Sequence, residues 1–433
     1  MRNYNKLFQL LPVAALFATS TASATNGYFS HGYGMTAKGM GGVATALSQD
    51  TFGGANNPAS MVWVGDRLDV GLDWFSPKRD AERVGAGIPS LNGKVESGHT
   101  NFFIPELGYN TMLNSNMSLG VTVYGNGGMN TSFPQGNFNC GAGAANLLCG
   151  SGKLGVDLSQ LIVAPTVAYS VNPRHSVGIA ALLAYQRFKA EGLQAFNNAP
   201  GFPPFTGAPG SVTNNGYDTS TGGGVRIGYL GRLTDTISVG AAYATKITMG
   251  NFDKYKGLFA QGGNFDIPAN YSVGVVFSPD PALTVALDYQ RIMYGKIASI
   301  ANASLPVAPL GAQNGPGFGW QDVTVVKVGV AYKINDQLTL RTGYNRGSNP
   351  IQSKDVTFNI LAPGVAKDHF TLGLTYSICN TCEITFAYMH VPRVTVSGSS
   401  LFNGLFPAPP NAGGRESIGL RENSLGIAWS KKF

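Results

Sequence analysis

Strict alternation of apolar residues with small or polar ones runs through most of this chain after residue 66. Segment 175–188 is an example, because alternate residues of an extended strand point to opposite faces. Its apolar face consists of Val177, Ile179, Ala181, Leu183 and Tyr185. Its other face carries mostly Ser, Gly and Ala, whereas a soluble sheet would carry many Lys and Glu there. Only 12% of all residues are charged, against about 25% in soluble domains. The alternation therefore predicts strands with one face toward lipid.

Fourteen segments of this kind follow one another, and most have the length of a tilted membrane strand. They are 67–77, 99–113, 116–125, 160–171, 175–188, 220–233, 236–247, 267–278, 282–294, 322–334, 337–346, 368–378, 383–391 and 421–433. Short turns rich in Asn, Asp and Pro alternate with long loops between them, which is the outer-membrane rule. An aromatic girdle is predicted at Tyr169, Tyr185, Tyr229, Tyr243, Tyr289, Tyr332 and Tyr376. The sequence therefore predicts an all-β fold, a transmembrane antiparallel β-barrel of 14 strands in residues 67–433.

The first residues form a targeting signal. Arg2 and Lys6 are basic, residues 10–17 are apolar, and Ala22-Ser23-Ala24 is a small-residue cleavage site. We expect residues 1–24 to be a signal peptide and the barrel to lie in the outer membrane of a Gram-negative cell.

Between the leader and the barrel lies a segment without helical or strand periodicity. Nine of residues 26–66 are glycine. A segment this flexible and unpatterned does not build a core of its own. We therefore expect residues 25–66 to fold inside the barrel as a plug.

The run NGYFSHGYGMTAKGMGGVATALSQDTFGGANNPASM (26–61) resembles the N-terminal hatch of the FadL/TodX family of outer-membrane transporters. That hatch closes on an Asn-Pro-Ala triplet, here Asn57, Pro58 and Ala59. Pro105 and the segments 340–344 and 388–390 are also similar to family positions. The resemblance implies a passive channel for long-chain fatty acids, aromatic hydrocarbons or other hydrophobic compounds. It implies capture on external loops, a pocket under the hatch N-terminus, and sideways exit at an inward kink of the third strand.

Two groups of residues are candidates for these roles. The strand-kink candidates are Gly125, Gly127 and Gly128, because glycine permits a bulge; the alternative is a strand that simply becomes a loop. The loop ligand-capture candidates are apolar residues in two external loops: Leu193, Phe196, Phe202, Phe205, Leu401, Phe402, Leu405 and Phe406. Exposed apolar clusters mark binding surfaces, and the alternative is that these side chains pack the loops together.

A few charged residues are assigned to the lumen face: Asp69, Asp73, Glu106, Arg226, Lys246, Asp288, Lys327 and Arg341. Mixed signs in a confined lumen favour pairing with one another or with the hatch. Arg341 and Lys327 are also candidates for holding a ligand carboxylate. Arg187 and Lys189 lie near a place where the family has a basic residue, and contact with lipid head groups is the alternative.

Four cysteines in an exported chain favour two local disulfides, Cys140 with Cys149 and Cys379 with Cys382. No second CxxC or histidine pair accompanies the CxxC, so we expect no metal and no cofactor. The scattered histidines and the absence of a GxSxG motif argue against an enzyme. Scattered Lys and Arg favour outer-membrane lipid and lipopolysaccharide over nucleic acid as partners. We expect a monomer. A general aqueous porin and a structural or adhesin barrel stay open as alternatives.

Overall fold

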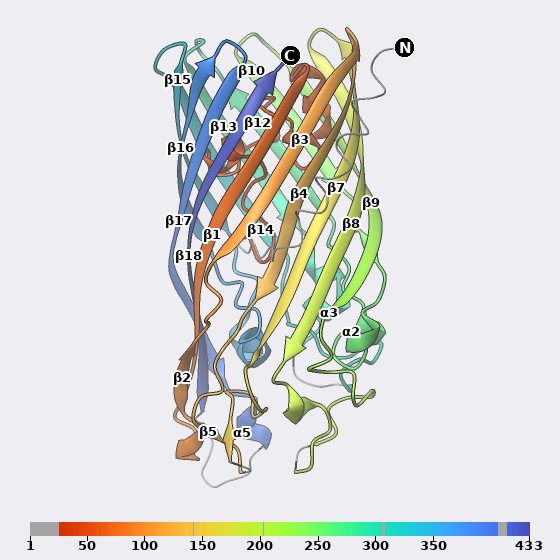
Figure 1. Cartoon of the computed structure of the whole chain (residues 1–433), viewed down its shortest axis with the longest axis vertical. Helices are drawn as coiled ribbons and strands as arrows, with labels where there is room; N and C mark the ends of the chain where they lie inside the picture. Colours follow the sequence, from red (N-terminus) through yellow and green to blue (C-terminus); the bar gives the residue numbers. More distant parts are fainter. Residues whose placement is uncertain (1–25, 142, 202, 305–307, 406–413) are drawn as a thin grey trace.

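The computed structural model describes residues 26–141, 143–201, 203–304, 308–405 and 414–433 (Figure 1). In these ranges fourteen long strands pair antiparallel with their neighbours and form one closed ring, which confirms the predicted fold class. The ring closes where β18 pairs with β1, at the two ends of the barrel sequence. The strands are β1 Arg67–Val84, β3 Phe102–Asn114, β4 Met117–Asn130, β7 Gly155–Asn172, β8 His175–Glu191, β9 Asp218–Arg232, β10 Ile237–Ala244, β12 Asn270–Phe277, β13 Leu283–Ile292, β14 Val323–Lys333, β15 Leu338–Gly347, β16 Asp368–Cys379, β17 Cys382–Ser399 and β18 Arg415–Lys432.

Several short strands and helices lie outside the fourteen strands of this ring. The strands β2 (Gly93–Glu96) and β11 (Thr248–Met249) extend the sheet beside β1 and β9, and β5 (Phe138–Asn139) pairs with β6 (Ala144–Ala145) in a loop. The described helices are short, with three to six residues each: α1 Met35–Lys38, η2 Phe52–Gly54, η3 Pro58–Trp63, η4 Pro89–Leu91, η5 Gln194–Phe196, η6 Asp253–Tyr255, α2 Ala260–Gly263, η7 Tyr294–Lys296, α3 Ala298–Ala301, η8 Ser353–Asp355, α4 Val356–Asn359 and α5 Phe402–Leu405. Within the described ranges, no helix has the length and apolarity needed to cross a membrane.

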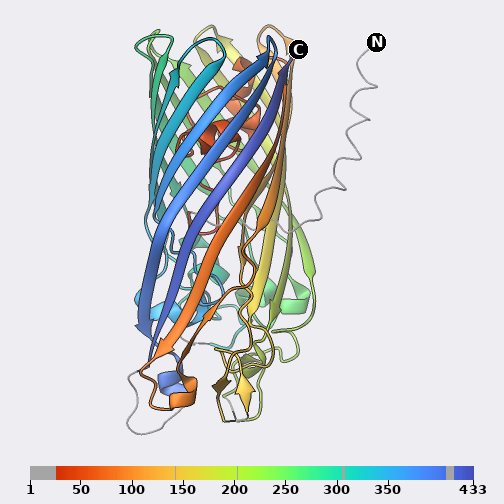
Figure 2. The ribbon, with the colours of Figure 1, turned by 60° about the vertical axis from the view of Figure 1, so that its left-hand side comes forward.

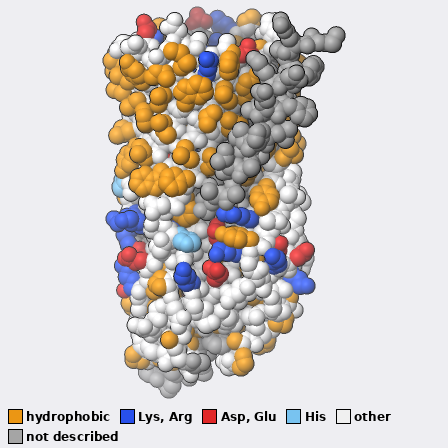
Figure 3. Space-filling model, in the orientation of Figure 1, with side chains coloured by type: hydrophobic (Ala, Val, Ile, Leu, Met, Phe, Trp, Pro, Cys, Tyr) orange, Lys and Arg blue, Asp and Glu red, His pale blue; other side chains and the backbone are white. Residues whose placement is uncertain are grey.

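The apolar residues of the alternating pattern face outward. Trp74 is 43% exposed and Leu183 is 55% exposed, whereas Ser176 and Ala180, on the other face of β8, are fully buried. All seven tyrosines predicted for the girdle are exposed. In Figure 3 the hydrophobic side chains form a band over the half that carries the short turns and the C-terminus, and charged side chains gather at its border. This band has the distribution of a lipid-facing surface.

Several strands run further than predicted on the side of the long loops. β1 continues to Val84, β17 continues to Ser399, and β18 already begins at Arg415. The predicted ends were wrong because they were drawn where the apolar alternation stops. Backbone pairing needs no apolar face, and the ladder between β1 and β18 continues without interruption through Lys78 and Arg421. The wall of the barrel therefore extends beyond the apolar band on the side of the long loops (Figure 2).

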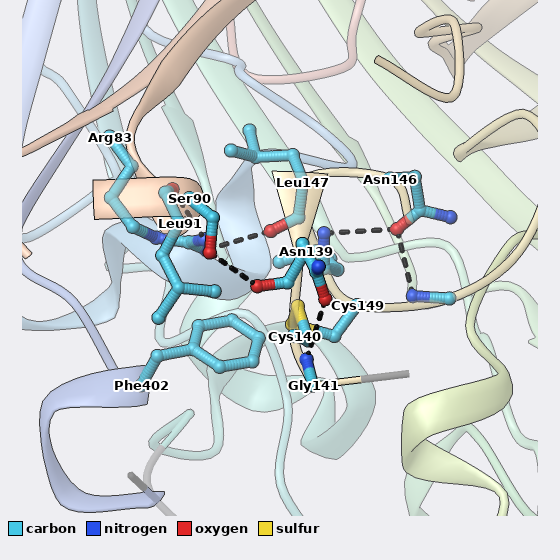
Figure 4. The surroundings of a disulfide bond; sticks show 12 residues. Arg83, Ser90, Leu91, Asn139, Cys140, Gly141, Asn146, Leu147, Cys149 and Phe402 are labelled. Atoms are coloured by element: carbon cyan, nitrogen blue, oxygen red, sulfur yellow. Dashed lines mark hydrogen bonds between the residues drawn. A yellow bond between two sulfur atoms is a disulfide. The ribbon is translucent and has the colours of Figure 1, made fainter. Parts of the chain in front are cut away.

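The external loops have a packed interior of their own. In Figure 4 the disulfide between Cys140 and Cys149 lies near Arg83, a fully buried residue at the outer end of β1. The Arg83 guanidinium donates to the Leu147 carbonyl over 2.8 Å and to Glu416, and it lies 4.4 Å from the centre of the Phe402 ring. These contacts join the loop between β4 and β7 to β1, β18 and α5. The outer end of the barrel is thus covered by ordered loops.

Candidate functional site

The N-terminal segment, residues 26–66, runs through the lumen (Figure 2) and touches the wall on several sides. Its main chain approaches the strands where these carry lumen-facing glycines. A Cβ atom at Gly240 would overlap the Thr45 carbonyl, and one at Gly343 would overlap Met40 and Gly41. Glycine is needed at such positions because no side chain fits between the two backbones. The many glycines of the strands are therefore explained in part by the segment that they face.

The Asn57-Pro58-Ala59 triplet anchors the end of this segment to β8 and β9. The Asn57 amide donates to the Thr45 carbonyl at 2.7 Å and to the Tyr229 carbonyl at 2.8 Å. Its Oδ1 accepts from the Ala59 N–H, which caps η3, and Pro58 occupies the first turn of that helix. Ser176 of β8 donates to the Ala59 carbonyl. A Cβ at Gly228 would overlap Asn57 Oδ1, so the wall is shaped to receive the triplet.

The acidic residues of the lumen face hold the same segment. Asp73 accepts from Lys38 Nζ at 2.8 Å. Asp69 Oδ2 accepts from the Thr51 N–H and hydroxyl. Asp288 Oδ2 accepts from the backbone N–H groups of residues 44 and 45. These carboxylates are buried, and each has a partner in the N-terminal segment.

The basic residues of the lumen face also form hydrogen bonds with the N-terminal segment. Lys327 Nζ donates to the carbonyls of His31 and Gly42, at 3.0 and 3.1 Å, and Arg226 donates to Gly54. These contacts agree with the expectation that lumen charges pair with one another or with the N-terminal segment. The expectation is wrong for Lys246, which lies past the end of β10, is exposed and pairs with Asp266.

Several ionisable groups of the N-terminal segment have shifted pKa values, and His31 and Asp50 are two of them. Burial, followed by the neighbouring His369 ring, lowers the pKa of His31 well below its usual range, so its imidazole is neutral. Burial, followed by the negative charge of Asp69, raises the pKa of Asp50 to about 7. The docked segment therefore favours a protonated Asp50 and a neutral His31.

The wall itself is interrupted between β3 and β4. Their ladder begins at Leu107 paired with Val123, and within the described residues the outer halves, 102–106 and 124–130, share no ladder. We call these residues the unpaired stretch. Pro105 lies in it and has no N–H to give to a ladder. The opposite edge of β4 pairs with β7 as far as Asn130.

The start of the N-terminal segment occupies the edge of β4 that β3 leaves open. The Gly128 N–H donates to the Tyr28 carbonyl, and the Ser30 N–H donates to the Asn126 carbonyl, each at 3.2 Å. The pairing of β4 with β7 shifts register between Gly125 and Gly127, which makes Asn126 a bulge. A Cβ at Gly127 would overlap the Tyr28 carbonyl. β4 therefore does not become a loop at Gly125, the alternative that the sequence had left open.

Tyr294 and Trp320 hold this start in place from the one long loop between β13 and β14. The Tyr294 hydroxyl accepts from the backbone N–H groups of Tyr28 and Phe29 and donates to the Asn26 carbonyl at 2.7 Å. The Trp320 ring packs edge-on against Tyr294, with centroids 5.2 Å apart. The sequence analysis missed both residues. They lie in a long loop where no periodicity distinguishes one aromatic residue from another.

A small cavity of about 20 Å³, room for about one water molecule, lies between the start of the N-terminal segment and the wall. We call it the N-terminal cavity. It is lined by Gly27, Phe75, Pro77, Arg79, Gly128, Met129, Asn130, Trp320, Ala362, Pro363, Gly364, Leu420 and Glu422. Its walls come from β1, β4 and β18 and from two external loops, so it lies beside the unpaired stretch. A second small cavity, of about 30 Å³, is more polar and is lined by Arg226, Asp288 and Lys327 among others.

The four candidates for a ligand carboxylate are not brought together. Lys327 holds the N-terminal segment, and Arg341 donates to Thr375. Arg187 and Lys189 lie over the Tyr217 ring, at 4.7 and 5.3 Å. None of the four lines the N-terminal cavity as described.

The capture candidates lie mostly inside the loops. Leu193, Phe196, Phe205 and Phe402 are buried, and Phe196 packs against Phe205 at 5.1 Å. They form no exposed apolar surface, because they pack the loops together, as the sequence alternative held. Leu401 is partly exposed. Phe202, Phe406, the Leu405 side chain and residues 1–24 lie outside the described part of the chain.

The structure joins Cys140 to Cys149 and Cys379 to Cys382. The second disulfide closes the turn between β16 and β17. None of the four cysteines lines the N-terminal cavity.

Comparison with known proteins gives a family match over most of the chain. The model of the outer membrane protein transport protein family (OMPP1/FadL/TodX) matches residues 11–401. No relative was found among curated protein sequences.

Three solved structures share this fold. The P. putida toluene transporter TodX has a TM-score of 0.69 at 19% identity, over 93% of this chain and 99% of that one. A Pseudomonas aeruginosa FadL homologue has 0.65 at 17%, over 96% and 100%. The Ralstonia pickettii toluene transporter TbuX has 0.62 at 17%, over 93% and 99%.

Proposed function

This chain belongs to the OMPP1/FadL/TodX family of outer membrane transport proteins, and from that premise we propose how it carries hydrophobic molecules across the outer membrane. The family is one of transporters rather than enzymes. We propose a passive channel in which the N-terminal segment, with residue 25, is the hatch and residues 1–24 are a removed signal peptide. The cargo is a long-chain fatty acid or an aromatic hydrocarbon. The ring of strands closes on itself, which supports a monomer.

The single observation that carries the proposal is the place of residues 28–30. Their main chain is hydrogen-bonded to the edge of β4 where β3 has withdrawn. The N-terminal cavity lies directly behind them. A shift of these few residues would connect the cavity with the unpaired stretch, and through it with the lipid. Gly125, Gly127 and Gly128 serve this exit by permitting the bulge and the close approach of the two chains.

Sideways exit suits an apolar molecule. A hydrophobic solute that crosses an open lumen must enter water, which is unfavourable in proportion to its apolar area. Exit through the wall keeps it in contact with protein and then with lipid tails. The lumen of this protein is occupied by the N-terminal segment, which also argues against an open aqueous path.

Entry from outside is proposed at a cavity of about 400 Å³ among the external loops. It is lined by Phe358 and Leu401 together with serines, Lys354 and Arg415. The apolar groups offer contact to a hydrocarbon, and the two cations offer contact to an acidic head group. Leu401 is thus the capture candidate that the structure leaves accessible. Arg187 and Lys189, beside Tyr217, are proposed to contact lipid or lipopolysaccharide head groups.

The test is to cross-link the start of the N-terminal segment to β4. Ser30→Cys with Asn126→Cys places two cysteines on residues whose backbones are hydrogen-bonded at 3.2 Å. We expect the oxidised pair to abolish uptake of hydrophobic substrate by intact cells, while each single variant retains it. A matched control links the anchored end instead, by Ala59→Cys with Ser176→Cys, where Ser176 donates to the Ala59 carbonyl. This second link should leave uptake unchanged. Undiminished uptake with the first link closed would refute the proposed gate.

A further inference from the structure

Lys78 and Arg421 form an unusual cross-strand pair on the outer surface of the wall. In the register of β1 with β18 the two residues lie directly opposite each other, and both side chains are exposed. Side chains that face each other in this way have their Cβ atoms about 4.5–5.5 Å apart, and two like charges so placed destabilise a sheet. The ion pairs formed among the described residues include neither of the two. We call them the basic pair.

The acidic side chains further out on the same surface have bases of their own. Asp80, in the next outward row of β1, accepts two hydrogen bonds from Arg393, at 2.5 and 2.7 Å. Lys94 lies 3.9 Å from the same carboxylate, and it faces Glu82 in the pairing of β2 with β1. Glu96 faces Asp80 and so belongs to this outward group as well. The basic pair therefore lies beside a group in which acids and bases already alternate, and it keeps its positive charge.

The row on the lipid side of the basic pair offers further hydrogen-bond donors. Asn423 lies two residues after Arg421 on the same face of β18, and Ser76 faces it from β1. Asn423 Oδ1 accepts from the Tyr388 hydroxyl at 3.0 Å and lies 2.9 Å from His390 Nδ1. These contacts orient the amide and occupy its oxygen. Its Nδ2 group donates to no described residue, so it is a free donor beside two cations, as an anion site requires.

The next row toward the lipid is apolar. Trp74 on β1 faces Leu425 on β18, and both are exposed. The basic pair thus lies at the border of the apolar band, where charged side chains gather in Figure 3. β1 leads from the side of the short turns to the side of the long loops, and long loops are external in outer-membrane barrels. The surface therefore suits an amphiphile of the outer leaflet with an anionic head group above its hydrocarbon chains.

We propose that the basic pair, Lys78 and Arg421, binds a phosphate group of lipopolysaccharide. The lipid A part of lipopolysaccharide carries phosphate monoesters above its acyl chains, in the outer leaflet that this surface meets. A phosphate monoester carries about −1.5 to −2 charges at pH 7 and has three acceptor oxygens, so one group neutralises both cations. Asn423 Nδ2 and the Ser76 hydroxyl add donors, and the apolar row receives the acyl chains. The site depends on the outer-membrane location and is independent of the proposed transport.

Three lipids test this on the unaltered full-length protein, purified in detergent and freed of bound lipid: lipid A with its phosphates, the same lipid A without them, and phosphatidylglycerol. Native mass spectrometry resolves each bound lipid and gives its Kd. We expect phosphorylated lipid A to bind at least about tenfold more tightly than the form without phosphate, because the charge-assisted hydrogen bonds are lost. Phosphatidylglycerol has a phosphodiester with a single charge and should bind at least about threefold more weakly than phosphorylated lipid A. This comparison needs no variant to fold.

A double variant, Lys78→Gln with Arg421→Gln, then assigns the preference to the basic pair. It should lose at least about tenfold in affinity for phosphorylated lipid A and change by less than about twofold for the form without phosphate. Arg174→Gln with Lys333→Gln is the matched control, because it removes two exposed cations from the short turns at the other end of the barrel. Charges that far from the site are screened by salt, so the control should keep the preference of the unaltered protein.

Equal binding of the two forms of lipid A to the unaltered protein would overturn the inference. Phosphatidylglycerol that binds as tightly as phosphorylated lipid A would also overturn it, because the surface would then attract any anionic lipid. The same holds if the double variant keeps the preference, or if the control variant loses it to the same degree.

Discussion

Replacing Asn57 by alanine tests whether the triplet fixes the N-terminal segment in the lumen. The Asn57 side chain makes three buried hydrogen bonds: it donates to Thr45 and Tyr229 and accepts from Ala59. A buried hydrogen bond contributes about 1 kcal/mol net, and loss of a helix N-cap costs about 1 kcal/mol. The carbonyls of Thr45 and Tyr229 would also lose a donor. The substitution should therefore destabilise the docked segment by about 2–4 kcal/mol, while the barrel ladders stay intact.

The assay is amide hydrogen exchange of the purified protein, read by peptide. A loss of 3 kcal/mol corresponds to roughly a 150-fold faster opening equilibrium for residues 26–66. Peptides from β1, β8 and β18 should keep their protection. Asn56→Ala is the matched control, because the Asn56 amide makes one bond, to the Tyr33 carbonyl at 2.9 Å. Its effect should be about 1 kcal/mol. If Asn57→Ala changed exchange no more than Asn56→Ala, contact with β9 would not be what holds the segment.

Three further predictions concern the same segment. Gly228→Ala should loosen residues 26–66, because its Cβ would overlap Asn57 Oδ1, whereas Gly223→Ala in the same strand meets only the Leu182 carbonyl at 3.9 Å and should be neutral in the same exchange assay. The pKa of Asp50 is raised to about 7 in the docked state and returns toward about 3.9 when the group is solvated, so the contribution of Asp50 to docking should weaken as pH rises from about 4 to about 7. The lowered pKa of His31 acts in the opposite direction below about pH 6.5, so docking of the unaltered protein should change little between about pH 4 and about pH 6.5. Asp50→Asn removes the Asp50 contribution, so docking of this variant should strengthen as pH rises through the same window; an equal slope in both proteins would contradict the assignment. In planar bilayers the unaltered protein should be nearly silent in simple salt and should conduct when residues 26–56 are deleted, and large steady openings of the unaltered protein would favour an aqueous porin instead.

The barrel could be predicted from one sequence because its signal is repeated in every strand. A membrane strand must place an apolar side chain outward at every second position, and residues such as Leu183 and Trp74 do so. The ends of β1, β17 and β18 could not be predicted. Outside the lipid no such constraint acts on their side chains, and pairing follows the neighbouring strand instead.

Residues of the candidate site could be predicted from the sequence only where the residue type itself indicates a particular backbone geometry. Asn57 and Pro58 could be singled out from their motif, and the glycines of β4 from the space that a bulge needs. Tyr294 and Trp320 could not, since each acquires its role from partners far away in the sequence. The loop phenylalanines were misjudged for a related reason: periodicity does not tell whether a loop side chain faces water or another loop.

In the proposed gate, the unpaired stretch also favours a closed resting state. The start of the N-terminal segment takes the place of a neighbouring strand, since residues 28–30 are hydrogen-bonded to the edge of β4 that β3 leaves open. If these residues moved without a replacement, the Gly128 N–H and the Asn126 carbonyl would lose their partners, and an unpaired backbone group away from water costs several kcal/mol. Tyr294 adds three bonds that would break in the same movement. Opening of the proposed gate therefore has to replace these bonds or break them.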